Sequence, residues 1–60
     1  MRGDFAGIVM GSWISLRDDG TGLCSYKDRE YVTSPLGTKS IRKGEKVELF
    51  FSDGVYYSKW

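Results

Sequence analysis

The chain has 60 residues, with nine basic and eight acidic side chains, one cysteine and no histidine. This length closes one domain over residues 1–60, and a domain of that size buries only about 60% of its unfolded surface. One cysteine excludes an internal disulfide, the lack of histidine disfavours a metal site, and a net charge of +1 disfavours nucleic-acid binding by bulk charge alone.

The residue types also bear on chemistry and location. Histidine, the usual general base, is missing, and no serine or cysteine stands in a nucleophile motif, so we expect a non-enzymatic protein without a cofactor or metal. Nine aromatic side chains predict either a closely packed aromatic core or self-association. The chain has no long apolar run and no secretory signal pattern, which predicts a cytoplasmic protein with no membrane partner.

The first predicted element is a hairpin. Two β-rich runs, Phe5–Met10 and Trp13–Arg17, are separated by Gly11 and Ser12, and a glycine in the first central position suits a type II′ turn. One face of this hairpin is too apolar to be fully wetted, and we predict it as a protein interface. That face carries Ile8, Met10 and Trp13.

The middle of the chain predicts shorter strands. Residues 18–22 have turn composition, and a strand is expected over Leu23–Tyr26, with its cysteine, Cys24, as a small core residue. The segment Lys27–Glu30 is expected to be a charged loop, with a single helical turn as the alternative. A further strand is expected over Tyr31–Thr33, ending where residues 34–37 (SPLG) interrupt it.

The last third predicts a hairpin from Val47 to Trp60, with Asp53 and Gly54 in a type I′ turn. A two-residue turn pairs Phe51 with Tyr56, Phe50 with Tyr57, Leu49 with Ser58, Glu48 with Lys59, and Val47 with Trp60. A bulged three-residue loop would instead pair Leu49 with Tyr57. We favour the first register because it joins a carboxylate to an ammonium group and apolar side chains to apolar side chains.

This register separates two faces. The face expected to point inward carries Val47, Leu49, Phe51, Tyr56 and Trp60. Phe50 and Tyr57 then lie side by side on the outer face, where they form a candidate platform that could stack nucleobases or hold an extended peptide. The alternative is that the pair covers a second sheet layer or a subunit interface.

One basic cluster precedes this hairpin. Its members are Lys39, Arg42, Lys43 and Lys46. Beside the aromatic pair they would form a phosphate-contacting loop. The alternative is a solvated turn around Gly44 that protects a sheet edge.

Part of the chain resembles a known family. Residues 43–47 (KGEKV) followed by residues 52–57 (SDGVYY) resemble the first hairpin of Tudor-type and other SH3-like barrels, over less than a third of the chain. The resemblance implies a small barrel with a different order of strands, and not a cage for methylated ligands.

Together these patterns predict an all-β fold, a small antiparallel barrel or strongly bent sheet of five to six short strands, SH3-like or OB-like. The expected function is a non-enzymatic binding module for nucleic acid, using Phe50 and Tyr57 with the basic cluster. The alternative is a protein–protein interaction module, or a small homo-oligomer that binds or inhibits a protein partner, using the face of Ile8, Met10 and Trp13.

Overall fold

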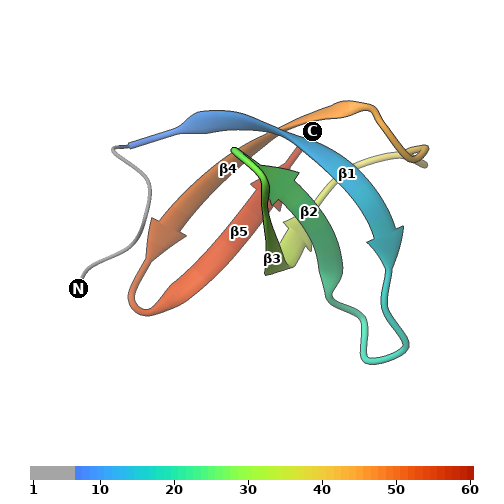
Figure 1. Cartoon of the computed structure of the whole chain (residues 1–60). Coiled ribbons are helices and arrows are strands. Elements are labelled where there is room, and N and C mark those ends of the chain that lie inside the picture. Colours follow the sequence, from blue (N-terminus) through green and yellow to red (C-terminus); the bar gives the residue numbers. More distant parts are fainter. Residues whose placement is uncertain (1–6) are drawn as a thin grey trace.

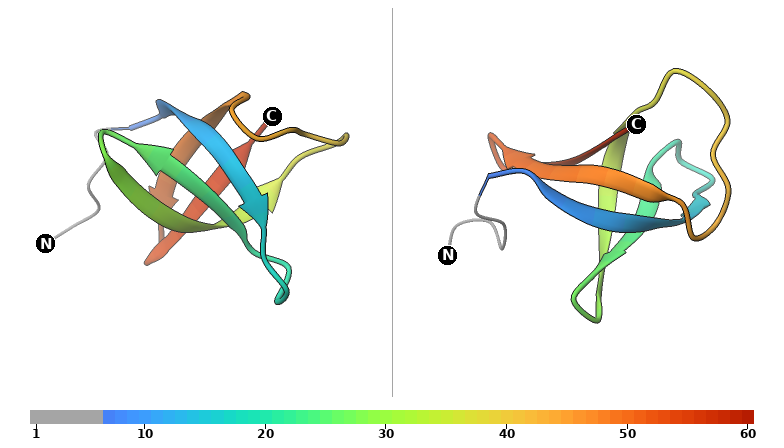
Figure 2. Two further views of the ribbon diagram at one scale, coloured as in Figure 1. Left: turned by 45° about the vertical axis from the view of Figure 1, so that its right-hand side comes forward. Right: turned by 90° about the horizontal axis from the view of Figure 1, so that it is seen from above.

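A computed structural model describes residues 7–60, which form five strands (Figure 1). The strands are β1 (Val9–Leu16), β2 (Gly22–Tyr26), β3 (Arg29–Leu36), β4 (Lys46–Ser52) and β5 (Val55–Lys59). They close into a barrel in the order β1-β2-β3-β5-β4, with β4 paired to β1 (Figure 2). The predicted all-β fold is confirmed. Over this part of the chain, no helix has the length and apolarity needed to cross a membrane.

The topology is a Greek key. Strands β1, β2 and β3 follow one another as antiparallel neighbours, and a long connection over residues 37–45 returns the chain to β4, beside β1. A five-stranded Greek-key barrel is OB-like, one of the two expected types. The expectation of a wholly antiparallel barrel is wrong at one pair, because β3 and β5 run parallel.

The predicted hairpin around Gly11 and Ser12 is wrong. Both residues lie inside the continuous strand β1, whose first half pairs with β4 and whose second half pairs with β2. Ser12 pairs with both neighbouring strands, at the place where β1 passes from one pairing to the other. Gly11 is required for close approach, because a Cβ there would lie 2.6 Å from the backbone oxygen of Ser25. The Phe5 and Ala6 part of the predicted hairpin lies outside the described residues.

The middle strands are longer than predicted. Strand β2 agrees with the expected Leu23–Tyr26 run, but only Lys27 and Asp28 form the turn that follows it, both with positive φ (49° and 65°). Strand β3 therefore begins at Arg29, and it continues through Pro35 instead of breaking at residue 34. The pairing of β2 with β3 ends at Gly22 and Thr33, so the missing N–H of Pro35 removes no bond to β2.

The β4–β5 hairpin has the favoured register. Phe51 pairs with Tyr56, and Phe50 pairs with Tyr57, across a turn in which Asp53 and Gly54 have φ of 51° and 77°. Both central residues with positive φ define a type I′ turn, whose twist matches the flanking strands. The pairs of Leu49 with Ser58 and Glu48 with Lys59 are also confirmed.

The core of the barrel is small and partly polar. Its buried apolar cluster contains Trp13, Cys24, Val47 and Leu49, with Val9, Tyr26, Ile41 and Trp60 packed around it. The inward direction predicted for Val47 and Leu49 is thus confirmed. Phe51 is 36% exposed: it contacts Tyr56 and lies at the rim, outside the core proper.

Three buried polar groups meet beside this cluster. The hydroxyl of Thr33 lies 2.9 Å from the carbonyl oxygen of Gly22 and 2.8 Å from the hydroxyl of Ser58. The Gly22 carbonyl can only accept, so Thr33 donates its single hydroxyl proton to that carbonyl. The oxygen of Thr33 then accepts the second hydrogen bond from the hydroxyl of Ser58. The network joins β2, β3 and β5 inside the barrel.

Replacing Thr33 with valine is expected to lower the free energy of unfolding by about 1–3 kcal/mol, because the Gly22 carbonyl and the Ser58 hydroxyl lose their partner. Urea denaturation of Thr33→Val, Ser58→Ala and the double variant measures the coupling. We expect Thr33→Val to cost less when Ser58 is already alanine. Strictly additive costs would contradict the network.

Candidate functional site

The predicted aromatic pair lies on the outer face of β4 and β5. The rings of Phe50 and Tyr57 are stacked, with centroids 5.2 Å apart and an interplanar angle of 17°, and both side chains are partly buried. Because the rings face each other, the far face of Tyr57 is turned toward β3, where its neighbour is the small side chain of Ser34. Tyr57 therefore lies opposite a small side chain on β3, with the exposed Val32 and Leu36 two residues to either side of Ser34.

The structure separates the basic cluster from this platform. Lys46 opens β4, and Phe50 lies four residues farther along that strand, about 13 Å away at roughly 3.3 Å per residue. The outer face between them carries the pair of Glu48 and Lys59. The other cations, Lys39, Arg42 and Lys43, belong to the connection between β3 and β4, which crosses one end of the barrel (Figure 2).

The predicted protein interface is also rearranged. Trp13 is only 5% exposed and belongs to the core, so it is not available on the surface with Ile8 and Met10. Those two side chains are 64% and 53% exposed. Met10 pairs with Glu48, and continuing this register by two residues places Ile8 beside Phe50. The two predicted surfaces thus adjoin each other on the outer face of β1, β4 and β5.

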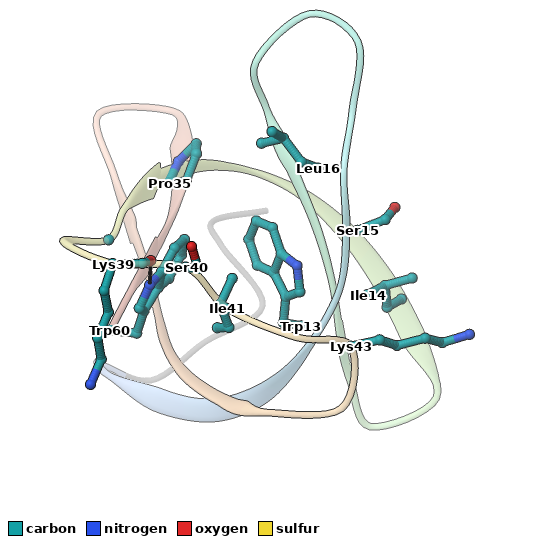
Figure 3. A pocket seen from close by; sticks show the side chains of 11 residues that line it. Trp13, Ile14, Ser15, Leu16, Pro35, Lys39, Ser40, Ile41, Lys43 and Trp60 are labelled. Atoms are coloured by element: carbon teal, nitrogen blue, oxygen red, sulfur yellow. Dashed lines mark hydrogen bonds between the residues drawn. The ribbon is translucent and has the colours of Figure 1, made fainter.

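Sequence reasoning missed a pocket at the end of the barrel, here called the end pocket. It has a volume of about 600 Å³ and opens between the end of β1, the end of β3 and the connection over residues 37–45 (Figure 3). Its lining residues are Trp13, Ile14, Ser15, Leu16, Pro35, Gly37, Lys39, Ser40, Ile41, Lys43 and Trp60. No signal along the chain joins these residues, because they come from three separate segments.

The two tryptophans organise the end pocket. Their rings meet edge to face, with centroids 4.9 Å apart. The indole Nε1–H of Trp60 donates a hydrogen bond of 2.7 Å to the backbone oxygen of Lys39, and Gly37 packs so closely on the Trp60 ring that a side chain there would collide with it. The partly buried Ile41 completes the apolar floor.

Within residues 7–60, the two titratable groups with a shifted pKa lie in different surroundings, one in the core and one in an exposed loop. Burial raises the pKa of the Cys24 thiol, and the hydroxyls of Thr33 and Ser58 oppose this only in part. A buried thiol with a raised pKa is a poor nucleophile, so Cys24 acts as a packing residue, as expected. Hydrogen bonds from Thr21 lower the pKa of the exposed Asp19 carboxyl, which therefore stays ionised.

Comparisons with protein-family models, with curated proteins and with solved structures find no match to this chain.

Proposed function

We propose that this chain is a non-enzymatic binding module for single-stranded nucleic acid. The observation that carries the proposal is the stacked pair of Phe50 and Tyr57 on the outer face of β4 and β5. Base–aromatic stacking contributes about 1–3 kcal/mol per base and tolerates any base, since every base has a π-face. Lys59, two residues from Tyr57, and Lys46 at the start of β4 supply two cations on the same face, against the one carboxylate of Glu48.

Two further considerations support nucleic acid over other ligands. By analogy of fold alone, OB-like barrels are used for binding oligonucleotides. Single strands present unpaired bases that can stack, whereas a duplex buries them. The small net charge is compatible with such a site because stacking supplies the part of the affinity that charge does not.

Replacing both Phe50 and Tyr57 with leucine is expected to weaken binding of a fluorescent oligothymidylate at least tenfold. Leucine keeps apolar bulk on the sheet and removes the ring faces, so the loss reports stacking and not unfolding. Fluorescence anisotropy at several salt concentrations measures the affinity. For single strands, the slope of log affinity against log salt is about −0.7 per neutralised phosphate.

The matched control is Phe51→Leu, which removes an exposed ring from the opposite face of the same strand. We expect this variant to bind as the wild type does. Equal binding by the Phe50 and Tyr57 leucine variant, or an affinity that does not change with salt, would refute the proposal.

The exposed side chains of Ile8 and Met10 favour a second candidate function, a protein-interaction module or small homo-oligomer. They extend the apolar surface from Phe50 onto β1, and a contiguous exposed apolar patch commonly marks a protein interface. Sedimentation separates the two forms of this candidate: a monomer at micromolar concentration would exclude the homo-oligomer.

A further inference from the structure

The end pocket brings together both tryptophans of the chain and two cations of the basic cluster. We propose that it receives one base of a bound single strand, whose two flanking phosphates contact Lys39 and Lys43. This inference rests on the proposed function and adds to it a second contact site, separate from the platform of Phe50 and Tyr57.

The charges around the pocket are complementary to a nucleic-acid backbone. Lys39 and Lys43 are the charged residues of the lining, and no carboxylate is among them. They stand on opposite sides of the apolar floor formed by Trp13, Ile41 and Trp60, with their ammonium groups at the outer edge (Figure 3). A nucleotide inside a strand has a phosphate on each side of its base, so the strand can approach both of the sides on which the lysines stand. A free monophosphate has its charge on one side only.

The size and composition of the pocket also suit a base. A volume of about 600 Å³ falls within the usual range of roughly 300–1,000 Å³ for small-ligand sites. The floor offers apolar surface and the partly exposed indole of Trp60, on which a base of any kind could stack. Hydrogen-bonding side chains are few, with Ser15 and Ser40 at the wall, so we expect weak sequence preference.

The backbone that carries each lysine is already held in place. On one side, Lys39 accepts the hydrogen bond from Trp60. On the other side, the backbone N–H of Trp13 donates to the backbone oxygen of Glu45 at 2.9 Å. The backbone oxygen of Trp13 accepts from the N–H of Gly44, next to Lys43, at 2.8 Å. Binding therefore does not have to order the backbone beside the two lysines, which reduces the entropy that association costs.

A neighbouring acidic loop limits the path of the strand. Asp18 and Asp19, between β1 and β2, line a separate hollow that shares Ser15 and Leu16 with the end pocket. Arg17 lines the same hollow, so the two carboxylates there are balanced by only one cation, and the hollow attracts phosphates less than the side with Lys39 and Lys43 does. The strand is therefore expected to cross from Lys39 to Lys43 and not over the β1–β2 loop.

The two tryptophans make the pocket observable, because the chain has no others. Fluorescent oligothymidylate is mixed with the full chain over a range of concentrations. The anisotropy of the oligonucleotide reports total binding, and the tryptophan emission of the protein reports the pocket. We expect emission to change with the same midpoint as anisotropy. Lys39→Gln with Lys43→Gln should weaken binding about tenfold and reduce the salt slope by roughly 0.7 per lysine.

The matched control is Lys27→Gln with Arg29→Gln, which removes the same charge around the β2–β3 turn, at the opposite end of the barrel. It should change the affinity less than about twofold. Binding with no change in tryptophan emission, or equal losses in the two double variants, would overturn the pocket and leave the proposed function standing. If the wild type binds no oligonucleotide, the proposed function and the pocket fall together.

Discussion

Replacing Leu49 with alanine is expected to lower the free energy of unfolding by about 2–5 kcal/mol. Leu49 is fully buried at the centre of the core cluster, where it pairs with Val9 on one side and with Ser58 on the other. A core of this size rarely supplies more than about 3–5 kcal/mol in total, so a large part of the chains should be unfolded at room temperature.

Urea denaturation followed by tryptophan fluorescence measures this loss, with Leu36→Ala as the matched control. Leu36 is 44% exposed on the outer face of β3, and the same substitution there is expected to change stability by about 0.5 kcal/mol or less. Similar shifts for the two variants would contradict the position of Leu49 at the centre of the barrel.

Replacing Gly11 with alanine is expected to cost about 3 kcal/mol, at the upper end for overpacking. The new Cβ would collide with the side chain of Leu49 and lie 2.6 Å from the backbone oxygen of Ser25. The leucine could change its rotamer, but the Ser25 carbonyl belongs to β2 and can move only with that strand. Both neighbours of β1 would therefore be displaced.

Thermal or urea unfolding of Gly11→Ala should be compared with Gly20→Ala. Gly20 has a φ of +90° and nothing within 4 Å of its Cβ position, so alanine there meets backbone strain alone, worth about 1 kcal/mol. If Gly11 lay in a turn, as the sequence predicted, its replacement by alanine would lower the stability by a similarly small amount. An effect of Gly11→Ala no larger than that of Gly20→Ala would therefore restore the hairpin interpretation.

The part of the fold that was predicted correctly depends on neighbours in sequence. The β4–β5 hairpin follows from the alternation over β4 and from Asp53 and Gly54, which set the turn type and with it every pair along the two strands. The stacked Phe50 and Tyr57 follow from the same register. A short loop leaves few alternatives, so local chemistry suffices there.

The predictions were wrong where contacts with residues distant in sequence determine the local structure. Gly11 and Ser12 have the composition of a turn, but Gly11 is needed because Leu49 and Ser25 approach it across the barrel. Pro35 has the composition of a strand break, yet it lies past the end of β2, where its missing N–H is tolerated. Composition alone cannot distinguish a turn from a close approach between strands.

The sequence by itself determined an all-β chain, the register of its last hairpin and the aromatic pair on the outer face, since these depend on alternation and turn chemistry. Only the tertiary structure decided that Trp13 is buried, that Trp60 closes against it, and that Lys39 and Lys43 flank their pocket. The physical reason is barrel closure: the Greek-key connection carries the basic loop across the barrel end and away from Phe50 and Tyr57.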